Sequence, residues 1–184
     1  MSNLFYGGNK LLDAKKILER VEIAEGMKVA DLGCGGAGHF CVPAAHLVGN
    51  SGIVYAVDIQ KIVIEGVRSR RKTEGIDNLK TIQANIENYK STGIKDGFCD
   101  LVMLINILFQ SHKYFDILKE AIRMLKNSGT LLIVDWNQSV IPFGPPLESR
   151  VKKSEINALL YKLASERIDE FDAGKYHFGM IFKK

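Results

Sequence analysis

Short apolar runs alternate along this chain with stretches whose apolar residues recur every three or four positions. The apolar runs predict five strands that are buried in a sheet, at residues 27–32, 53–57, 79–84, 99–105 and 130–134. The stretches of helical periodicity predict five helices, at residues 9–21, 43–48, 61–74, 114–125 and 153 to about 164. Asn9 and Ser154 are the expected N-caps of the first and last of these helices.

The pattern changes after the fifth strand. Residues 137–146 hold three of the four prolines of the chain, which predicts a loop. Residues 167–171 and 176–182 predict two further strands, and their connection is too short for a crossover, so they pair antiparallel. The alternation of strand and helix before this point implies right-handed parallel crossovers. We therefore predict an α/β fold with a three-layer, doubly wound, mostly parallel sheet.

Polar residues and glycines stand where the predicted strands end. In a doubly wound sheet, ligands bind beyond the carboxyl ends of the strands. Glycine lets a ligand approach the backbone without a Cβ in the way, so the loop after the first strand is the first candidate for a nucleotide site. The positions at this edge are Asp31, the glycine-rich loop 33–38, Asp58, Asn85, residues 104–106 and residues 135–136.

The glycine loop fits two classes of nucleotide. Gly33, Gly35 and Gly38 satisfy G-x-G-x-x-G, and Asp58 follows about 20 residues later, as in NAD-binding proteins. Asp31, two residues before the first glycine, would repel a pyrophosphate and would instead face a cationic group of the ligand. The chain also shows no second dinucleotide-binding half. These two features favour a ligand other than NAD.

Four motifs together resemble the class I, seven-stranded S-adenosylmethionine-dependent methyltransferases. They are Val-Ala-Asp-Leu-Gly-Cys-Gly-Gly-Ala-Gly at 29–38, Val-Tyr-Ala-Val-Asp at 54–58, Cys-Asp-Leu-Val-Met-Leu-Ile-Asn at 99–106, and Leu-Lys-Asn-Ser-Gly-Thr-Leu at 125–131. The last one departs from the family's usual Leu-Lys-Pro-Gly-Gly at a turn. The resemblance covers nearly the whole chain and implies one domain over residues 1–184, with strand order 3-2-1-4-5-7-6 and the last strand antiparallel.

The resemblance also implies a binding site for S-adenosylmethionine, with S-adenosylhomocysteine as the product. Asp31 would lie near the ammonium group of the cofactor, Asp58 would accept hydrogen bonds from both ribose hydroxyls, and Ile59 would pack on the adenine. Asn85 and Ile86 would lie beside the adenine amino group. Gly33, Cys34 and Gly35 would line the methionine part of the cofactor, and Leu104 would contact it through its backbone. Gly38 would be a further cofactor-binding residue.

The methyl acceptor is less well defined by the sequence. The resemblance implies that segments 5–10, 106–112 and 135–147 face the acceptor. They are rich in aromatic residues and proline, which favours a small molecule; the aromatic residues are Phe5, Tyr6, Phe109, Trp136 and Phe143. Asp135 and His112 are the two candidate general bases, and a base is needed only if the acceptor must lose a proton.

Three other functions stay open on the sequence. A basic cluster at residues 68–72 would suit an RNA or protein methyltransferase, although a solvated helix face is the simpler explanation. The fold could also bind the cofactor without turnover and act as a scaffold. An NAD-dependent dehydrogenase is the third alternative.

Composition and charge give information about the partners and the cellular compartment, and none about the reaction. The net charge of +4 allows nucleic acid as a partner and does not favour it. The three cysteines match no zinc pattern, so we expect no metal site and reduced thiols in the cytoplasm. No apolar run reaches the roughly 20 residues that span a bilayer, and no signal peptide is expected. A homo-oligomer stays open.

Overall fold

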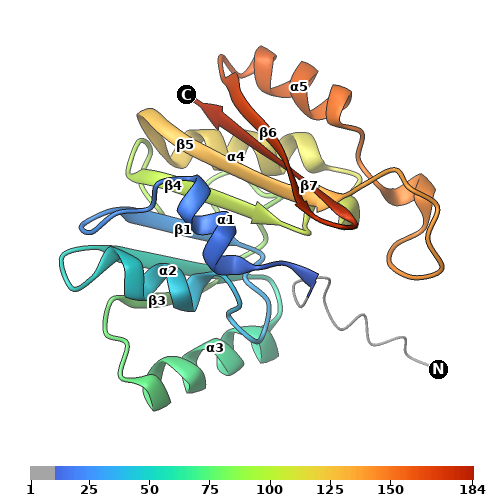
Figure 1. Cartoon of the computed structure of the whole chain (residues 1–184). Coiled ribbons are helices and arrows are strands. Elements are labelled where there is room, and N and C mark those ends of the chain that lie inside the picture. The colour runs from blue at the N-terminus through green and yellow to red at the C-terminus, as the bar shows by residue number, and fades with distance from the viewer. Residues whose placement is uncertain (1–10) are drawn as a thin grey trace.

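Seven strands form one sheet in the computed structural model, which describes residues 11–184 (Figure 1). The strand order is β3-β2-β1-β4-β5-β7-β6. All neighbours up to β5 pair parallel, whereas β7 pairs antiparallel with both β5 and β6. The predicted fold class and strand order are confirmed. The strands are β1 Lys28–Leu32, β2 Ile53–Asp58, β3 Leu79–Gln83, β4 Cys99–Ile105, β5 Leu125–Trp136, β6 Glu166–Gly174 and β7 His177–Lys183.

Helices cover both faces of the sheet and complete the three layers (Figure 1). Helices α1 (Ala14–Arg20), α2 (Cys41–Val48) and α3 (Lys61–Glu74) lie on one face. Helices α4 (Tyr114–Met124) and α5 (Lys153–Lys162) lie on the other. Two 3₁₀ turns, η2 (Leu108–Gln110) and η3 (Leu147–Ser149), follow β4 and β5 at the carboxyl edge of the sheet.

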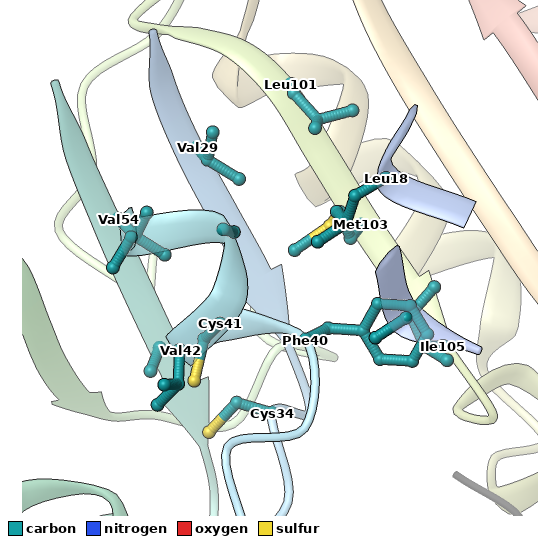
Figure 2. Packing of buried hydrophobic residues seen from close by; sticks show 14 of the residues in the cluster. Leu18, Val29, Cys34, Phe40, Cys41, Val42, Val54, Leu101, Met103 and Ile105 are labelled. Atoms are coloured by element: carbon teal, nitrogen blue, oxygen red, sulfur yellow. The ribbon is translucent and has the colours of Figure 1, made fainter. Parts of the chain in front are cut away.

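Each strand divides its side chains between two apolar layers, because successive residues of a strand point to opposite faces. On the α2 face, Val29, Val54 and Met103 pack with Phe40 and Cys41 from the start of α2 (Figure 2). The opposite face buries a second set that includes α4 and α5. Burial on both faces explains why the central strands read as continuous apolar runs rather than alternating ones.

The two predicted N-caps are wrong, although the last helix begins at residue 153 as predicted. Helix α1 begins after Asp13, whose side chain accepts the Lys16 backbone N–H (3.2 Å), and Asn9 lies outside the described residues. Helix α5 begins at Lys153 with Lys152 as its N-cap, so Ser154 stands inside the first turn and makes no capping hydrogen bond. In both helices the N-cap is the residue immediately before the first helical residue, Asp13 in α1 and Lys152 in α5.

Strand β5 begins earlier than predicted. The segment 127–129 was expected to be a turn before the strand, but β5 runs from Leu125, which pairs with Cys99. The backbone N–H of Ser128 donates to the Lys184 carbonyl (2.9 Å), and the Lys184 N–H donates to the Gly129 carbonyl (3.1 Å). Pairing with the end of β7 therefore keeps this segment in the sheet, although Ser128 has a φ of 64°.

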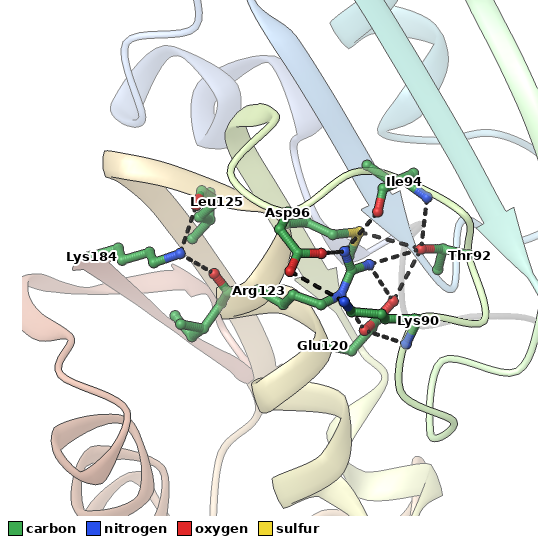
Figure 3. A network of polar contacts seen from close by, with 10 residues as sticks. Lys90, Thr92, Ile94, Asp96, Glu120, Arg123, Leu125 and Lys184 are labelled. Carbon is green, nitrogen blue, oxygen red and sulfur yellow. Dashed lines mark hydrogen bonds and ion pairs between the residues drawn. The ribbon is translucent and has the colours of Figure 1, made fainter.

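A buried ionic network joins α4 to the loop between β3 and β4 (Figure 3). The guanidinium of Arg123 donates twice to the carboxylate of Glu120 (2.7 and 2.8 Å), and also to Asp96 (2.6 Å) and the Ile94 carbonyl (2.7 Å). Glu120 also accepts the Lys90 backbone N–H (2.9 Å). Both Arg123 and Glu120 are buried, so this network fixes the loop 90–96 against α4.

Candidate functional site

The glycine loop leaves the sheet by bending from β1 toward β2. The backbone N–H groups of Gly33 and Cys34 both donate to the Val57 carbonyl, at 2.7 and 3.0 Å. Gly33 has a φ of 79°, and a Cβ on it would lie 2.0 Å from Cδ1 of Ile107, just after β4. Only glycine fits this crossing without displacing Ile107.

Gly35 and Gly38 turn the loop into α2. Both have positive φ (65° and 58°), and the Gly38 N–H donates to the Gly35 carbonyl (3.1 Å). The Gly38 carbonyl then accepts the Val42 N–H (3.1 Å) as the helix begins. The loop thus wraps the N-terminus of α2, where backbone N–H groups favour negative or electron-rich ligand atoms.

Helix α3 holds the other side of the loop. A Cβ on Gly66 would lie 2.9 Å from the Gly36 carbonyl oxygen, so the absent side chain lets α3 approach the loop backbone. Arg70 Nη1 donates to the Ala37 carbonyl (2.5 Å). Sequence reasoning missed both residues; the available signal was a glycine in the middle of a helix, which often marks close packing.

Asp58 lies against the glycine loop. Its Oδ2 accepts the Gly35 N–H (3.4 Å) and its Oδ1 accepts the Gln60 N–H (3.0 Å). The side chain is half-buried, which leaves lone pairs of the carboxylate for a ligand. The next residue, Ile59, is 56% exposed beside it.

Asp31 is buried, with an exposed fraction of 2%. Its Oδ2 has no hydrogen-bond partner among residues 11–184. Burial and the charge of Asp58 together raise the pKa of Asp31 to about 7, although the backbone N–H of Cys41 lowers it. A buried carboxylate oxygen without a partner is costly, and a bound cation would remove that cost.

The other predicted cofactor residues differ in position: Asn85 and Ile86 lie beside the end of β2, and Cys34 and Leu104 are buried. The Ala84 N–H donates to the Asp58 carbonyl (3.0 Å), which brings Asn85 and Ile86 beside the end of β2. The side-chain oxygen of Asn85 accepts the Glu87 N–H (3.0 Å). Cys34 and Leu104 are buried in the two apolar layers. Cys34 is a free thiol beside Cys41 (Figure 2), and burial and that neighbour raise its pKa.

Asp135 and His112, the two candidate bases, are in different surroundings. Asp135 is buried, and its carboxylate accepts the backbone N–H groups of Leu108 (3.1 Å), Phe109 (3.4 Å) and Trp136 (2.8 Å). Burial raises its pKa to about 7, although these N–H groups lower it. His112 is exposed and lines a cleft of about 290 Å³ between η2 and residues 147–155. Asp135 holds the turn η2 in place.

A family model described as "Methyltransferase domain" matches residues 23–175. The chain belongs to this family. Its members that share this sheet are the class I, S-adenosylmethionine-dependent methyltransferases, so the cofactor is S-adenosylmethionine.

Solved and curated relatives agree with this assignment. A SAM-dependent methyltransferase from Aquifex aeolicus is 25% identical and superimposes with a TM-score of 0.85, covering 95% of this chain and 90% of that one. The demethylmenaquinone methyltransferase of Lactococcus lactis is 26% identical over 69% of this chain and 49% of its own length. The ubiquinone/menaquinone biosynthesis C-methyltransferase of Vibrio campbellii is 26% identical over 96% of this chain and 65% of its own length. The chain therefore spans about half to two thirds of these curated relatives.

The residues around the glycine loop fit this cofactor. The unpartnered Oδ2 of Asp31 matches a cationic ammonium group, and the carboxylate of Asp58 matches a pair of neighbouring hydroxyls. Gly33 and Gly35 have positive φ values and carry no Cβ of their own on the loop backbone. In the described part of the chain, no group of three or more His, Cys, Asp or Glu side chains could hold a metal. No helix between residues 11 and 184 has both the length and the apolar character to cross a membrane.

Proposed function

We propose that this methyltransferase domain transfers a methyl group from S-adenosylmethionine to a small-molecule acceptor. The observation that carries the proposal is a pair of carboxylates next to the glycine loop: Asp58, which accepts the Gly35 N–H, and the buried Asp31, whose Oδ2 has no partner among the described residues. The cofactor supplies a methyl group already activated on a sulfonium. The family membership supports this reaction, and the printed names of the relatives, which act on quinone precursors, support a small acceptor.

The residues of the chain then act by holding and aligning. Asp58 would fix the ribose, the loop 33–35 would hold the methionine part, and Asp31 would oppose the ammonium group. Alignment of this kind can lower the activation barrier by up to about 7–11 kcal/mol. Asp135 supports the acceptor side by fixing η2, because its carboxylate already accepts three N–H groups. His112 stays a candidate base for an acceptor that must lose a proton.

Replacing Asp58 with alanine tests the cofactor site. Loss of charge-assisted hydrogen bonds to the ribose is expected to weaken binding of S-adenosylhomocysteine about 10- to 100-fold, measured by isothermal titration calorimetry. Asp77→Ala is the matched control, because Asp77 is exposed at the opposite edge of the sheet. Equal affinities of Asp58→Ala and the native chain would remove Asp58 from the ribose site. NAD in place of S-adenosylhomocysteine is expected to give no binding.

Binding of the cofactor is expected to release a proton from Asp31. The raised pKa means that the carboxyl group keeps its proton up to about pH 7, and the fold itself loses stability as the pH rises from about 4 to 7. A bound ammonium group favours the carboxylate, so roughly one proton should leave at pH 6. Titration calorimetry in two buffers of different ionisation enthalpy measures this number. Asp31→Asn should release none; unchanged release in that variant would place the titrating group elsewhere.

Further proposals concern the domain, its compartment, its acceptor or lack of one, and its oligomeric state. Residues 1–184 would act as one domain in the cytoplasm, where the three free cysteines stay reduced. An RNA or protein methyltransferase would differ by binding its acceptor with a steep dependence on salt. A scaffold protein would bind the cofactor but methylate nothing on a panel of acceptors. A homo-oligomer would be detected by light scattering.

A further inference from the structure

Strands β2 and β3 border a second cleft, on the face of the sheet that carries α4 and α5. Its volume is about 180 Å³, and three half-buried side chains line it, Tyr55, Ile82 and Phe98. Helices α4 and α5 pack against β4, β5 and β6, and no helix of residues 11–184 lies between β3 and β4 in the chain. The loop 92–98 therefore lies beside the side chains of β2 and β3 here, with the cleft between them.

The wall of this cleft is held in place from behind. Residues 92–95 form the wall. The hydroxyl of Thr92 donates to the carboxylate of Glu120 (3.0 Å), and the Ile94 carbonyl accepts from Arg123 (2.7 Å) (Figure 3). The buried ionic network thus anchors the wall at two points. A cleft with a fixed wall can bind a ligand without the entropic cost of ordering a loop.

The shape of the cleft suits an aromatic ring. The rings of Tyr55 and Phe98 meet edge to face, with centroids 6.0 Å apart and an interplanar angle of 71°. A third ring can stack on one of them and contact the edge of the other. Ile82 and Ile94 add aliphatic surface. An apolar cavity of about 150 Å³ can hold benzene, so a cleft of this size has room for one ring or two fused rings.

Three lysines surround the cleft. The ammonium group of Lys28 lies 4.6 Å from the centroid of the Phe98 ring. Lys80 pairs with Tyr55 in the register of β2 and β3, so it stands on the same face of the sheet. Lys95 lines the cleft, and both Lys80 and Lys95 are exposed. A ligand in the cleft therefore has positive charge on three sides.

This positive charge has no matching carboxylate in the described chain. None of the ion pairs between residues 11 and 184 includes any of the three lysines. The two carboxylates that flank Phe98 in the sequence are paired with other cations. Asp96 binds Arg123 and Asp100 binds Lys126, each at 2.6 Å. The charge around the cleft therefore favours an anionic ligand.

We propose that this cleft binds a small aromatic carboxylate, with its ring against Tyr55 and Phe98 and its carboxylate among the three lysines. None of the predicted cofactor residues lines the cleft, so the site is separate from the one proposed for S-adenosylmethionine. The limited volume favours a small molecule over a polymer. The inference does not depend on methyl transfer.

Nuclear magnetic resonance with two probe ligands tests the site and its charge preference. We would titrate the ¹⁵N-labelled chain with 2-naphthoate and with 2-naphthamide, which has the same shape and no charge. The naphthoate is expected to shift the amide signals of Tyr55, Gly93 and Lys95 in a saturable way. It should bind about 5-fold or more tightly than the amide, because contact with two or three ammonium groups adds to the contact of the ring. The preference should shrink as salt is added.

Paired lysine variants identify the groups that bind the carboxylate. The double variant Lys80→Gln with Lys95→Gln should bind both probes with similar affinity. Lys61→Gln with Lys72→Gln is the matched control, because these two exposed lysines lie on α3, on the other face of the sheet, and should keep the preference. Ile82→Trp should block both probes by filling the cleft. Binding of S-adenosylhomocysteine by the lysine variants checks that they are folded.

Four results would overturn the proposal. The first is no saturable shift by about 10 mM 2-naphthoate, since a ligand of this size that fits its site binds more tightly than that. The second is a shift confined to the cleft beside η2, at Ser111 and Glu148, and the third is a charge preference that survives in Lys80→Gln with Lys95→Gln. The fourth is tighter binding of an oligouridylate at the same signals, which would assign the cleft to RNA.

Discussion

Replacing Arg123 with leucine is expected to lower the free energy of unfolding by about 3–5 kcal/mol. The substitution leaves the carboxylate of Glu120 buried, with only the Lys90 N–H and the Thr92 hydroxyl (3.0 Å) as donors. Removing one partner of a buried ion pair costs more than the pair itself contributes, because the remaining charge is desolvated and unpaired. Urea denaturation followed by circular dichroism measures the loss.

Two further variants give this prediction its controls. Lys61→Met removes an exposed ion pair with Glu65 (3.7 Å) and is expected to cost less than about 1 kcal/mol. The double variant Arg123→Leu with Glu120→Leu should be more stable than Arg123→Leu alone, because no unpaired charge stays buried. If Arg123→Leu unfolded at the same urea concentration as Lys61→Met, the buried network would contribute no more to stability than an exposed ion pair does.

Replacing Gly33 with alanine is expected to cost about 2–4 kcal/mol of stability and most of the affinity for S-adenosylhomocysteine. Part of the loss is the φ of 79°, which a residue with a Cβ adopts at a cost of about 1–2 kcal/mol. The rest comes from Cδ1 of Ile107, 2.0 Å from the new methyl group. Ile107 or the loop must move, and the loop backbone then leaves its position beside Asp58.

Gly97→Ala separates these two causes. Gly97 also has a positive φ (63°), but a Cβ there meets no atom of the described chain within 4 Å, so only the conformational cost applies. Combining Gly33→Ala with Ile107→Ala should restore part of the cofactor affinity, because the second substitution removes the clash. Thermal unfolding and titration calorimetry test both. A Gly33→Ala chain that binds as tightly as the native one would show that the loop tolerates the shift.

Much of the fold could be predicted because its signals are local. The apolar runs located strands β1 to β5. The signal is clearest for β1 and β4, because strands that are buried on both faces carry no alternation to obscure them. The periodicity of 61–74 gave the bounds of α3, which ends at Gly75 with a φ of 65°. The start of β5 could not be predicted, because Asn127 and Ser128 favour a turn locally and only the distant residue Lys184 holds them in the sheet.

The candidate site could also be predicted only in part, because some of its contacts are local and others join distant segments. Asp31 and Asp58 could be located from their spacing to the glycines, and the structure places Asp31 in β1 just before the loop and Asp58 at the end of β2 in contact with Gly35. The crossing of Ile107 over Gly33 depends on two segments that are 74 positions apart in the chain, and no local pattern encodes it.

The insertion of β7 between β5 and β6 has a consequence for synthesis of the chain. Strand β6 leaves the ribosome before β7, the strand with which it pairs, and meanwhile β5 presents an open row of peptide groups. Unpaired edges of this kind recruit other nascent chains. Chaperone dependence during translation should therefore concentrate in the interval between the emergence of β5 and that of β7.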